Sequence, residues 1–208
     1  MKIKELFEEE KENKLSEDLV KQIVAECAPF INEVKNIAEY RLHRGILSNS
    51  FKPPRAKRIY EDEIFKVKVR KRRMPLHTNS LVHKSIDDWM LNNLGSRFRS
   101  QAVFCVGAKY QAAQYGVIYV VLPIGDFKFA WSKNVDDLYA ELDNPRARQD
   151  SKYITDFLDK AEYQTKNLRS AIKSFSSHEI MIDCESYYAF SLPVFLNEFI
   201  PIYEEIKT

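Results

Sequence analysis

The chain has 208 residues, of which 45% are hydrophobic and 30% charged, and its formal net charge is +2. This composition is typical of a globular protein with its own core, and it excludes a disordered chain or a collagen-like fibre. The longest apolar run, 117–124, is far shorter than the roughly 20 residues of a membrane-spanning helix. Because the first residues are rich in glutamate and carry no apolar stretch, we expect no signal peptide and a cytoplasmic protein.

The three cysteines stand far apart, at positions 27, 105 and 184. An odd count without CxxC spacing argues against a disulfide framework and against a structural zinc site. The four histidines show no paired ligand spacing either. We therefore expect reduced thiols and no metal.

The first third of the chain is expected to be helical and then to change to strands. Residues 1–39 form an expected N-terminal helical segment, because apolar residues recur at helical spacing on both sides of Pro29. A short strand is predicted at 42–47, followed by a half-exposed hairpin over 57–73 that turns near 61–63. Ser80 is expected to cap a helix that ends at Leu94 and closes at Gly95.

The remainder alternates short strands with short helices. Strands are predicted at 102–106, 117–122, 127–131, 178–183 and 187–192. Helices are predicted at 109–114, 136–142 and 153–174, with an amphipathic end at 196–206. Since the strands do not alternate regularly with long helices, the pattern favours an α+β fold over a doubly wound sheet.

Common nucleotide-binding and hydrolase motifs are missing. The five glycines, at 45, 95, 107, 116 and 125, form no GxGxxG and no GxxxxGK[ST], and there is no GxSxG. A Rossmann dinucleotide site, a P-loop and an α/β-hydrolase elbow are therefore not expected.

The first candidate site is His43-Arg44-Gly45, at the end of the first predicted strand. A partly buried arginine can clamp a phosphate or fix a ribose, and Gly45 would let a ligand approach the backbone. The alternative is an ordinary strand-end arginine with an ion-pair partner.

The second candidate site is Glu179, which opens the apolar strand Glu179-Ile-Met-Ile182. A carboxylate at the mouth of a buried strand can have a perturbed pKa and can stabilise a developing cation. The alternative is a solvated glutamate at a strand start.

Together these pieces resemble ADP-ribosyltransferases of the arginine/glutamate type, in the form found among bacterial toxins and phage proteins. The resemblance covers about residues 40–192 and rests on the order of five pieces: 43–45 (HRG), 102–107 (AVFCVG), 112–116 (AAQYG), 179–182 (EIMI) and 187–190 (YYAF). It implies a catalytic domain over 40–208, built as a split β-core flanked by helices.

The resemblance also implies an activity: transfer of ADP-ribose from NAD to a protein or nucleic acid, with release of nicotinamide and no metal. Glu179 would stabilise the oxocarbenium-like state, Arg44 would hold the phosphates or the adenosine-side ribose, and Tyr110 or Tyr115 would stack on the nicotinamide. The expected NAD-contacting residues are His43, Arg44, Gly45, Cys105, Tyr110 and Tyr115. Such a protein is expected to be a monomer, acting in the host cytoplasm if it is phage-encoded.

Two positions depart from the family pattern. The family's Ser-Thr-Ser stands where this chain has Phe104-Cys105-Val106-Gly107, and Ser100 or Cys105 could take the place of the missing serine. Ser177 stands two residues before Glu179, where arginine-modifying members carry Glu or Gln, so the acceptor is left open. An inactive relative with the same fold is one alternative.

The strongest charge feature is the segment 52–73, with ten Lys or Arg and three acidic residues in a chain of net charge +2. We expect it to bind an acidic host protein or a nucleic acid as the acceptor. The expected acceptor-binding residues are Lys66, Lys68, Arg70, Arg72 and Arg73. A non-catalytic nucleic-acid-binding protein and a solvated strand face are the alternatives.

Overall fold

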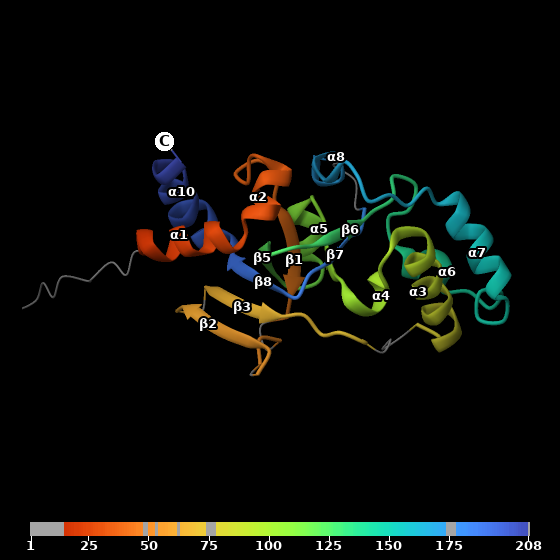
Figure 1. Cartoon of the computed structure of the whole chain (residues 1–208). Helices are drawn as coiled ribbons and strands as arrows, with labels where there is room; N and C mark the ends of the chain where they lie inside the picture. Colours follow the sequence, from red (N-terminus) through yellow and green to blue (C-terminus); the bar gives the residue numbers. More distant parts are fainter. Residues whose placement is uncertain are drawn as a thin grey trace, which may run out of the picture.

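The computed structural model describes residues 15–47, 50–52, 54–61, 63–73, 78–173 and 178–207. Over these residues the chain forms two antiparallel sheets with helices packed against them (Figure 1). The predicted α+β class is confirmed at this level. The helices of the described residues are short and no span that could cross a membrane occurs among them.

The larger sheet has five strands in the order β1-β5-β8-β3-β2. The strands are β1 (Leu42–Ile46), β5 (Val117–Ile124), β8 (Ser186–Ser191), β3 (Ile64–Lys68) and β2 (Ala56–Tyr60). Every neighbouring pair is antiparallel. The interior strand β5, which lies between β1 and β8, buries Val120, Val121 and Leu122 in succession, which explains why this segment is apolar throughout rather than alternating.

The smaller sheet has three strands in the order β4-β7-β6: β4 (Val103–Cys105), β7 (Ile180–Asp183) and β6 (Lys128–Ala130). Its central strand β7 is buried at Ile180, Met181 and Ile182. The two sheets are joined where His43 and Val106 exchange backbone hydrogen bonds, with N···O distances of 2.8 and 2.9 Å. The strands are therefore divided into two sheets that meet beside β1 and β4.

Helices from both ends of the chain cover one face of the larger sheet (Figure 1). They are α1 (Glu17–Glu26), α2 (Ala28–Val34) and α10 (Ile200–Lys207). Ser16 caps α1, and Pro29 falls in the first turn of α2, where the missing N–H costs nothing. Val20, Ile23 and Phe30 pack into the same hydrophobic cluster as the central strands, so these helices share the core of the sheet.

The smaller sheet packs against a second helical layer: α3 (Ser80–Leu94), α6 (Leu138–Leu142) and α7 (Ser151–Lys160). Met90, Leu158 and Met181 form part of its separate hydrophobic cluster. The expected cap of α3 at Ser80 is wrong by one residue, because the side chain of Asn79 accepts the Leu81 N–H at 2.8 Å. The helix closes at Gly95 in the left-handed conformation, as predicted.

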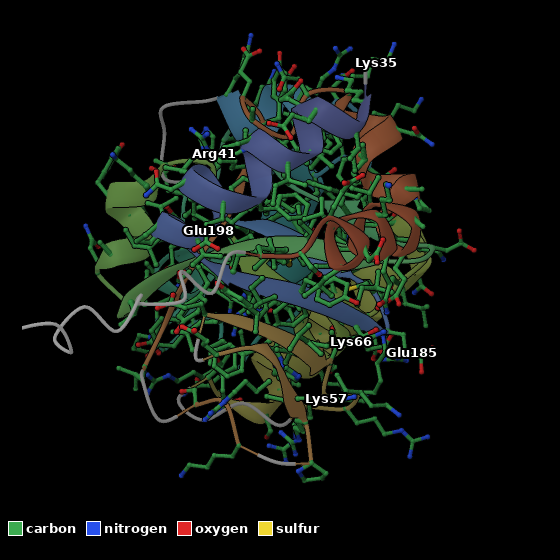
Figure 2. All side chains as sticks on the ribbon, turned by 90° about the vertical axis from the view of Figure 1, so that its left-hand side faces the viewer. Lys35, Arg41, Lys57, Lys66, Glu185 and Glu198 are labelled. Atoms are coloured by element: carbon green, nitrogen blue, oxygen red, sulfur yellow. The ribbon has the colours of Figure 1, made fainter. Side chains whose placement is uncertain are left out.

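One predicted helix is interrupted, and another begins earlier than predicted and contains a π-helical turn. The stretch 153–174 contains α7 and a separate α8 (Leu168–Lys173), because Gln164 leaves the helix to exchange backbone hydrogen bonds with Trp131. The C-terminal segment begins as α9 (Leu192–Val194) and passes through a π-helical turn, η1 (Phe195–Phe199), before α10. Glu198 in that turn accepts hydrogen bonds from the Leu15 N–H and the Tyr60 hydroxyl, which ties the turn to the hairpin (Figure 2).

Candidate functional site

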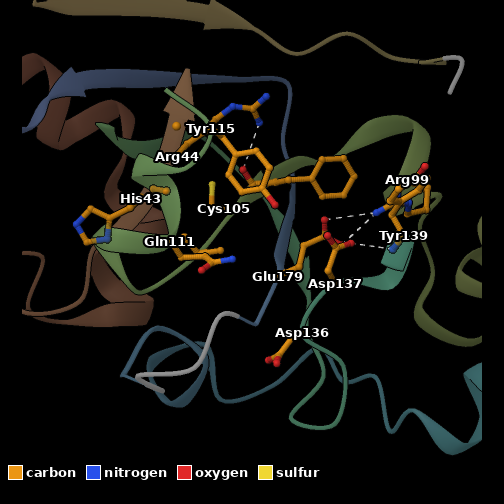
Figure 3. Close-up of a pocket in the computed structure, with 14 residues that line it drawn as sticks. His43, Arg44, Arg99, Cys105, Gln111, Tyr115, Asp136, Asp137, Tyr139 and Glu179 are labelled. Atoms are coloured by element: carbon orange, nitrogen blue, oxygen red, sulfur yellow. Dashed lines mark hydrogen bonds and ion pairs between the residues drawn. The ribbon is translucent and has the colours of Figure 1, made fainter. Parts of the chain in front are cut away.

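A pocket of about 380 Å³ lies at the junction of the two sheets, within the size range of small-molecule sites. Arg44 from β1 and Glu179 at the start of β7 both line it, although they stand 135 positions apart in the sequence (Figure 3). The remaining walls come from Arg99, from β4, from α5 (Lys109–Ala113) with the turn that follows it, and from the start of α6. The structure thus brings the two candidate sites of the sequence to one cavity.

Glu179 presents a largely desolvated carboxylate to this pocket. Its backbone N–H donates to the Asp136 carbonyl at 3.1 Å, and its side chain is 20% exposed. The Arg99 Nη1 donates to Oε2 at 3.1 Å and to Oε1 at 3.4 Å. Burial raises the pKa of Glu179 above its ordinary 4.5, and nearby Asp137 raises it further, whereas the Arg99 charge lowers it.

Arg44 keeps donors available for a ligand. Its Nη1 donates to the Phe104 carbonyl at 3.3 Å, and this is its one side-chain hydrogen bond among the described residues. A guanidinium has five N–H donors in a planar fork that fits the oxygens of a phosphate or carboxylate. Because Arg44 lines the pocket and is half-buried, the unused donors are placed where an anion can reach them.

Three arginines converge on Phe104. Arg44 binds its carbonyl, while the guanidinium carbons of Arg73 and Arg99 lie 4.5 and 4.8 Å from the centre of its ring. Arg99 comes from α4 (Phe98–Gln101), and Arg73 from the segment that leaves the hairpin. Burial, followed by the charges of Arg44 and Arg99, lowers the pKa of Arg73 to about 10. This corner of the pocket is therefore strongly positive.

Arg73 was predicted to belong to a surface that binds the acceptor, but its guanidinium is turned toward the wall of the pocket. Its Nη2 donates to the Ala102 carbonyl at 2.7 Å and to the Arg99 carbonyl at 3.1 Å, and its side chain stacks on Phe104. A guanidinium held by two carbonyls and an aromatic ring supports the pocket rather than an exposed face.

His43 and Cys105 line the pocket without offering a charged or reactive group. His43 is 5% exposed, and its Nδ1 lies 2.8 Å from the Gly107 carbonyl, which fastens β1 to the end of β4. Burial lowers the pKa of His43, which favours the neutral ring. Burial also raises the pKa of the Cys105 thiol to about 12, so the thiol stays protonated near neutral pH.

The glycine at position 45 is required by a neighbouring helix rather than by a ligand. A Cβ at Gly45 would lie 2.0 Å from the Ala112 carbonyl oxygen and 2.8 Å from the Tyr115 Cβ. Helix α5 therefore packs directly on the backbone of β1. Gly45 still lines the pocket, but the close approach predicted for a ligand is made by α5.

Of the two candidate tyrosines, the structure places only Tyr115 at the pocket. The side chain of Tyr110 does not line it, although it is about as exposed as that of Tyr115, at 58% against 57%. Ser100 does not line it either: its hydroxyl donates to buried Asp87 and lies 3.0 Å from the His83 Nε2. Ser177 lies outside the described residues.

One residue of the predicted acceptor surface forms an ion pair, and three others form none with the described residues. Lys66 is paired with Glu26, with Nζ and Oε2 2.6 Å apart, so it is not an open cation as expected. Lys68, Arg70 and Arg72 are exposed, and none of them has an ion pair among the described residues.

The neighbouring strand adds cations that the sequence pattern did not place. In the register of β2 and β3, Lys57 stands opposite Lys66 (Figure 2), and the Lys68 N–H donates to the Arg55 carbonyl. Because like charges directly across a strand pair repel each other, this arrangement lowers stability. The exposed face of this hairpin is therefore a concentrated positive surface, and we call Arg55, Lys57, Lys68, Arg70 and Arg72 the hairpin cations.

Known proteins offer no guide to this site. Comparison with protein-family models, curated proteins and solved structures finds no match to the chain. Among the described residues there is also no cluster of three or more His, Cys, Asp or Glu side chains suited to hold a metal ion. Function has to be argued from the pocket and its charges.

Proposed function

We propose that this protein transfers ADP-ribose from NAD to a macromolecule. The observation that carries the proposal is the meeting of Arg44 and Glu179 in one pocket at the junction of the sheets. The division of the strands into two sheets is also what a split β-core requires. These features support the family resemblance of residues 40–192, and they favour an enzyme over a fold that has lost its site.

The chemistry assigned to Glu179 is stabilisation of positive charge. The bond between the ribose C1′ and the nicotinamide nitrogen breaks, and its electron pair leaves with neutral nicotinamide. The sugar then has oxocarbenium character, as in glycoside cleavage, and a nearby carboxylate stabilises it. A nucleophile of the acceptor attacks C1′ and releases its proton to water, which completes the transfer. Glu179 must be ionised for this role, and Arg99 beside it favours the ionised form.

The other pocket residues fit the rest of the dinucleotide. The donors of Arg44 that bind none of the described residues suit the diphosphate, because charge-assisted and bidentate hydrogen bonds are the strongest that a side chain can offer. Tyr115 supplies an aromatic face for the nicotinamide ring. Asp136 and Asp137 also line the pocket, next to Glu179, and suit the positive charge of the pyridinium before it leaves.

The hairpin cations are the proposed surface for the acceptor. An exposed cluster of unpaired cations attracts a nucleic acid or an acidic protein face. The same surface would serve a nucleic-acid-binding protein without catalysis. The pocket favours catalysis, because a binding module has no use for a desolvated carboxylate beside an arginine cluster.

Release of nicotinamide from NAD, measured with and without a cell lysate as the source of acceptor, tests the proposal. Glu179→Gln keeps the volume but loses the charge, so we expect turnover to fall at least about a hundredfold. Glu185→Gln, at an exposed position on the following turn, is the matched control and should stay at the wild-type rate. Equal rates for wild type and Glu179→Gln would refute the assignment.

A further inference from the structure

Glu179 is contacted by a residue outside the motifs that identified the site. The family's polar triplet is replaced by Phe104-Cys105-Val106, in which Phe and Val have no polar side-chain atom and Cys is a weak donor. The contact to the carboxylate comes instead from Arg99, 80 positions earlier, whose Nη1 reaches both oxygens.

Arg99 is held by contacts on several sides. Its guanidinium lies against the Phe104 ring, and its backbone carbonyl accepts a hydrogen bond from Arg73 at 3.1 Å. The next residue, Ser100, is anchored to Asp87, which accepts both its backbone N–H, at 3.2 Å, and its hydroxyl. Asp87 is buried, so this anchor fixes α4 to α3 from within the core. The Arg99 side chain is 11% exposed, which limits its freedom to turn toward solvent.

We propose that Arg99 is the positioning residue for Glu179: it aims the carboxylate into the pocket and supplies the positive charge that keeps it ionised, while Phe104 holds the guanidinium in place. The role assigned to Glu179 rests on the proposed function. The contact itself and its electrostatic effect do not, since they concern only groups of this chain.

Among the charges around Glu179, that of Arg99 has the largest effect in lowering the pKa of its carboxyl. The titratable and charged groups that face it are Arg99, Arg73, Arg44, Asp136, Asp137, Tyr139, Tyr115, Tyr163, Cys105 and His178. Of these, Arg99 is the one with a hydrogen bond to the carboxylate among the described residues. Without Arg99, burial and Asp137 would be opposed mainly by the charge of Arg73, which has a smaller effect than that of Arg99, so the pKa of Glu179 would rise further.

Titration of the Glu179 carboxyl by NMR, with ¹³C-labelled glutamate and the signal assigned from its absence in Glu179→Gln, tests this directly. In Arg99→Gln we expect the midpoint of the titration to move upward by about 1 to 3 pH units, which is the range of pKa shifts that a close opposite charge causes. Arg99→Lys keeps the charge but loses the planar fork and the stacking, so a smaller upward move is expected. Phe104→Leu, which removes only the ring, should also give a smaller upward move.

Arg97→Gln is the matched control. Arg97 lies two residues away, is 39% exposed and pairs with Asp88 at 2.6 Å, away from the pocket. It should leave the Glu179 midpoint at the wild-type value. A wild-type midpoint in Arg99→Gln would overturn the proposal, and if that variant fails to fold, a wild-type midpoint in both Arg99→Lys and Phe104→Leu would do so.

The pH dependence of nicotinamide release provides a second measurement and separates the two proposals. The acidic limb of the pH–rate profile should move to higher pH in the same order of variants. A merely structural defect would lower the rate at every pH without moving the limb. If the NMR midpoints move but wild type releases no nicotinamide, the proposed function fails and the assignment of Arg99 stands. If wild type releases nicotinamide and the midpoints coincide, the proposed function stands and the assignment of Arg99 fails.

Discussion

The pocket gathers arginines and the hairpin gathers both arginines and lysines, but the two regions hold these cations in opposite ways. In and beside the pocket the arginines have fixed partners: Arg44 and Arg73 donate to backbone carbonyls, and Arg99 binds Glu179. On the hairpin, Lys68 and Arg70 extend into solvent without an ion pair among the described residues.

The difference follows from solvation. A charge withdrawn from water needs partners to offset its desolvation, and those partners fix its direction. A charge left in water keeps its rotamer freedom and attracts counter-ions at a distance. Fixed charges suit chemistry on particular atoms of a small ligand, whereas solvated charges suit a large partner whose phosphates or carboxylates vary in position.

A substitution at Gly45 tests how rigid the pocket wall is, and it has the largest expected effect on the fold. Gly45→Ala forces a Cβ to within 2.0 Å of the Ala112 carbonyl oxygen, so α5 must move. We expect a loss of about 3 kcal/mol in the free energy of unfolding, measured by urea denaturation. Gly125→Ala is the control, with nothing within 4 Å but a φ of +66°, and should cost only about 1 kcal/mol. Equal losses would mean that α5 yields easily and that the wall is not rigid.

Charge reversal on the hairpin tests the other half of the comparison, with a smaller effect. Lys68→Glu combined with Arg70→Glu should lower transfer to the macromolecule about tenfold and leave nicotinamide release within twofold of wild type. For a nucleic-acid acceptor, the log–log salt slope of binding should shrink by about 1.4 to 1.8.

Lys35→Glu combined with Lys160→Glu changes the net charge equally at exposed positions elsewhere and should leave transfer unchanged. Loss of nicotinamide release and transfer together in the hairpin variant would show that the hairpin supports the pocket instead of the acceptor.

Local patterns predicted the strands well, but they failed where contacts with residues far away in the sequence determine the structure. The apolar runs placed β1 and β5 within two residues of their observed ends. The single long helix over 153–174 was wrong, because the break depends on backbone pairing of Gln164 with Trp131, 33 positions earlier. No periodicity within the segment itself reports such a partner.

The site shows the same limit. Short motifs pointed to Arg44 and Glu179, whereas nothing local distinguishes Arg97 from Arg99 on either side of Phe98. In the structure Arg97, just before α4, pairs with Asp88, whereas Arg99, within α4, pairs with Glu179. The pairing of Lys66 with Glu26, 40 positions away, was likewise invisible to a count of local charge.

Calorimetric titration with NAD, carried out on wild type, Arg44→Ala and Glu179→Gln, tests the central claim that this pocket holds the dinucleotide. Wild type should bind NAD, and Arg44→Ala should weaken binding by about tenfold or more through the loss of charge-assisted hydrogen bonds. Glu179→Gln should stay within a few-fold of wild type, because its interaction strengthens mainly in the transition state. Absence of NAD binding in wild type, or equal affinity in wild type and Arg44→Ala, would contradict the account.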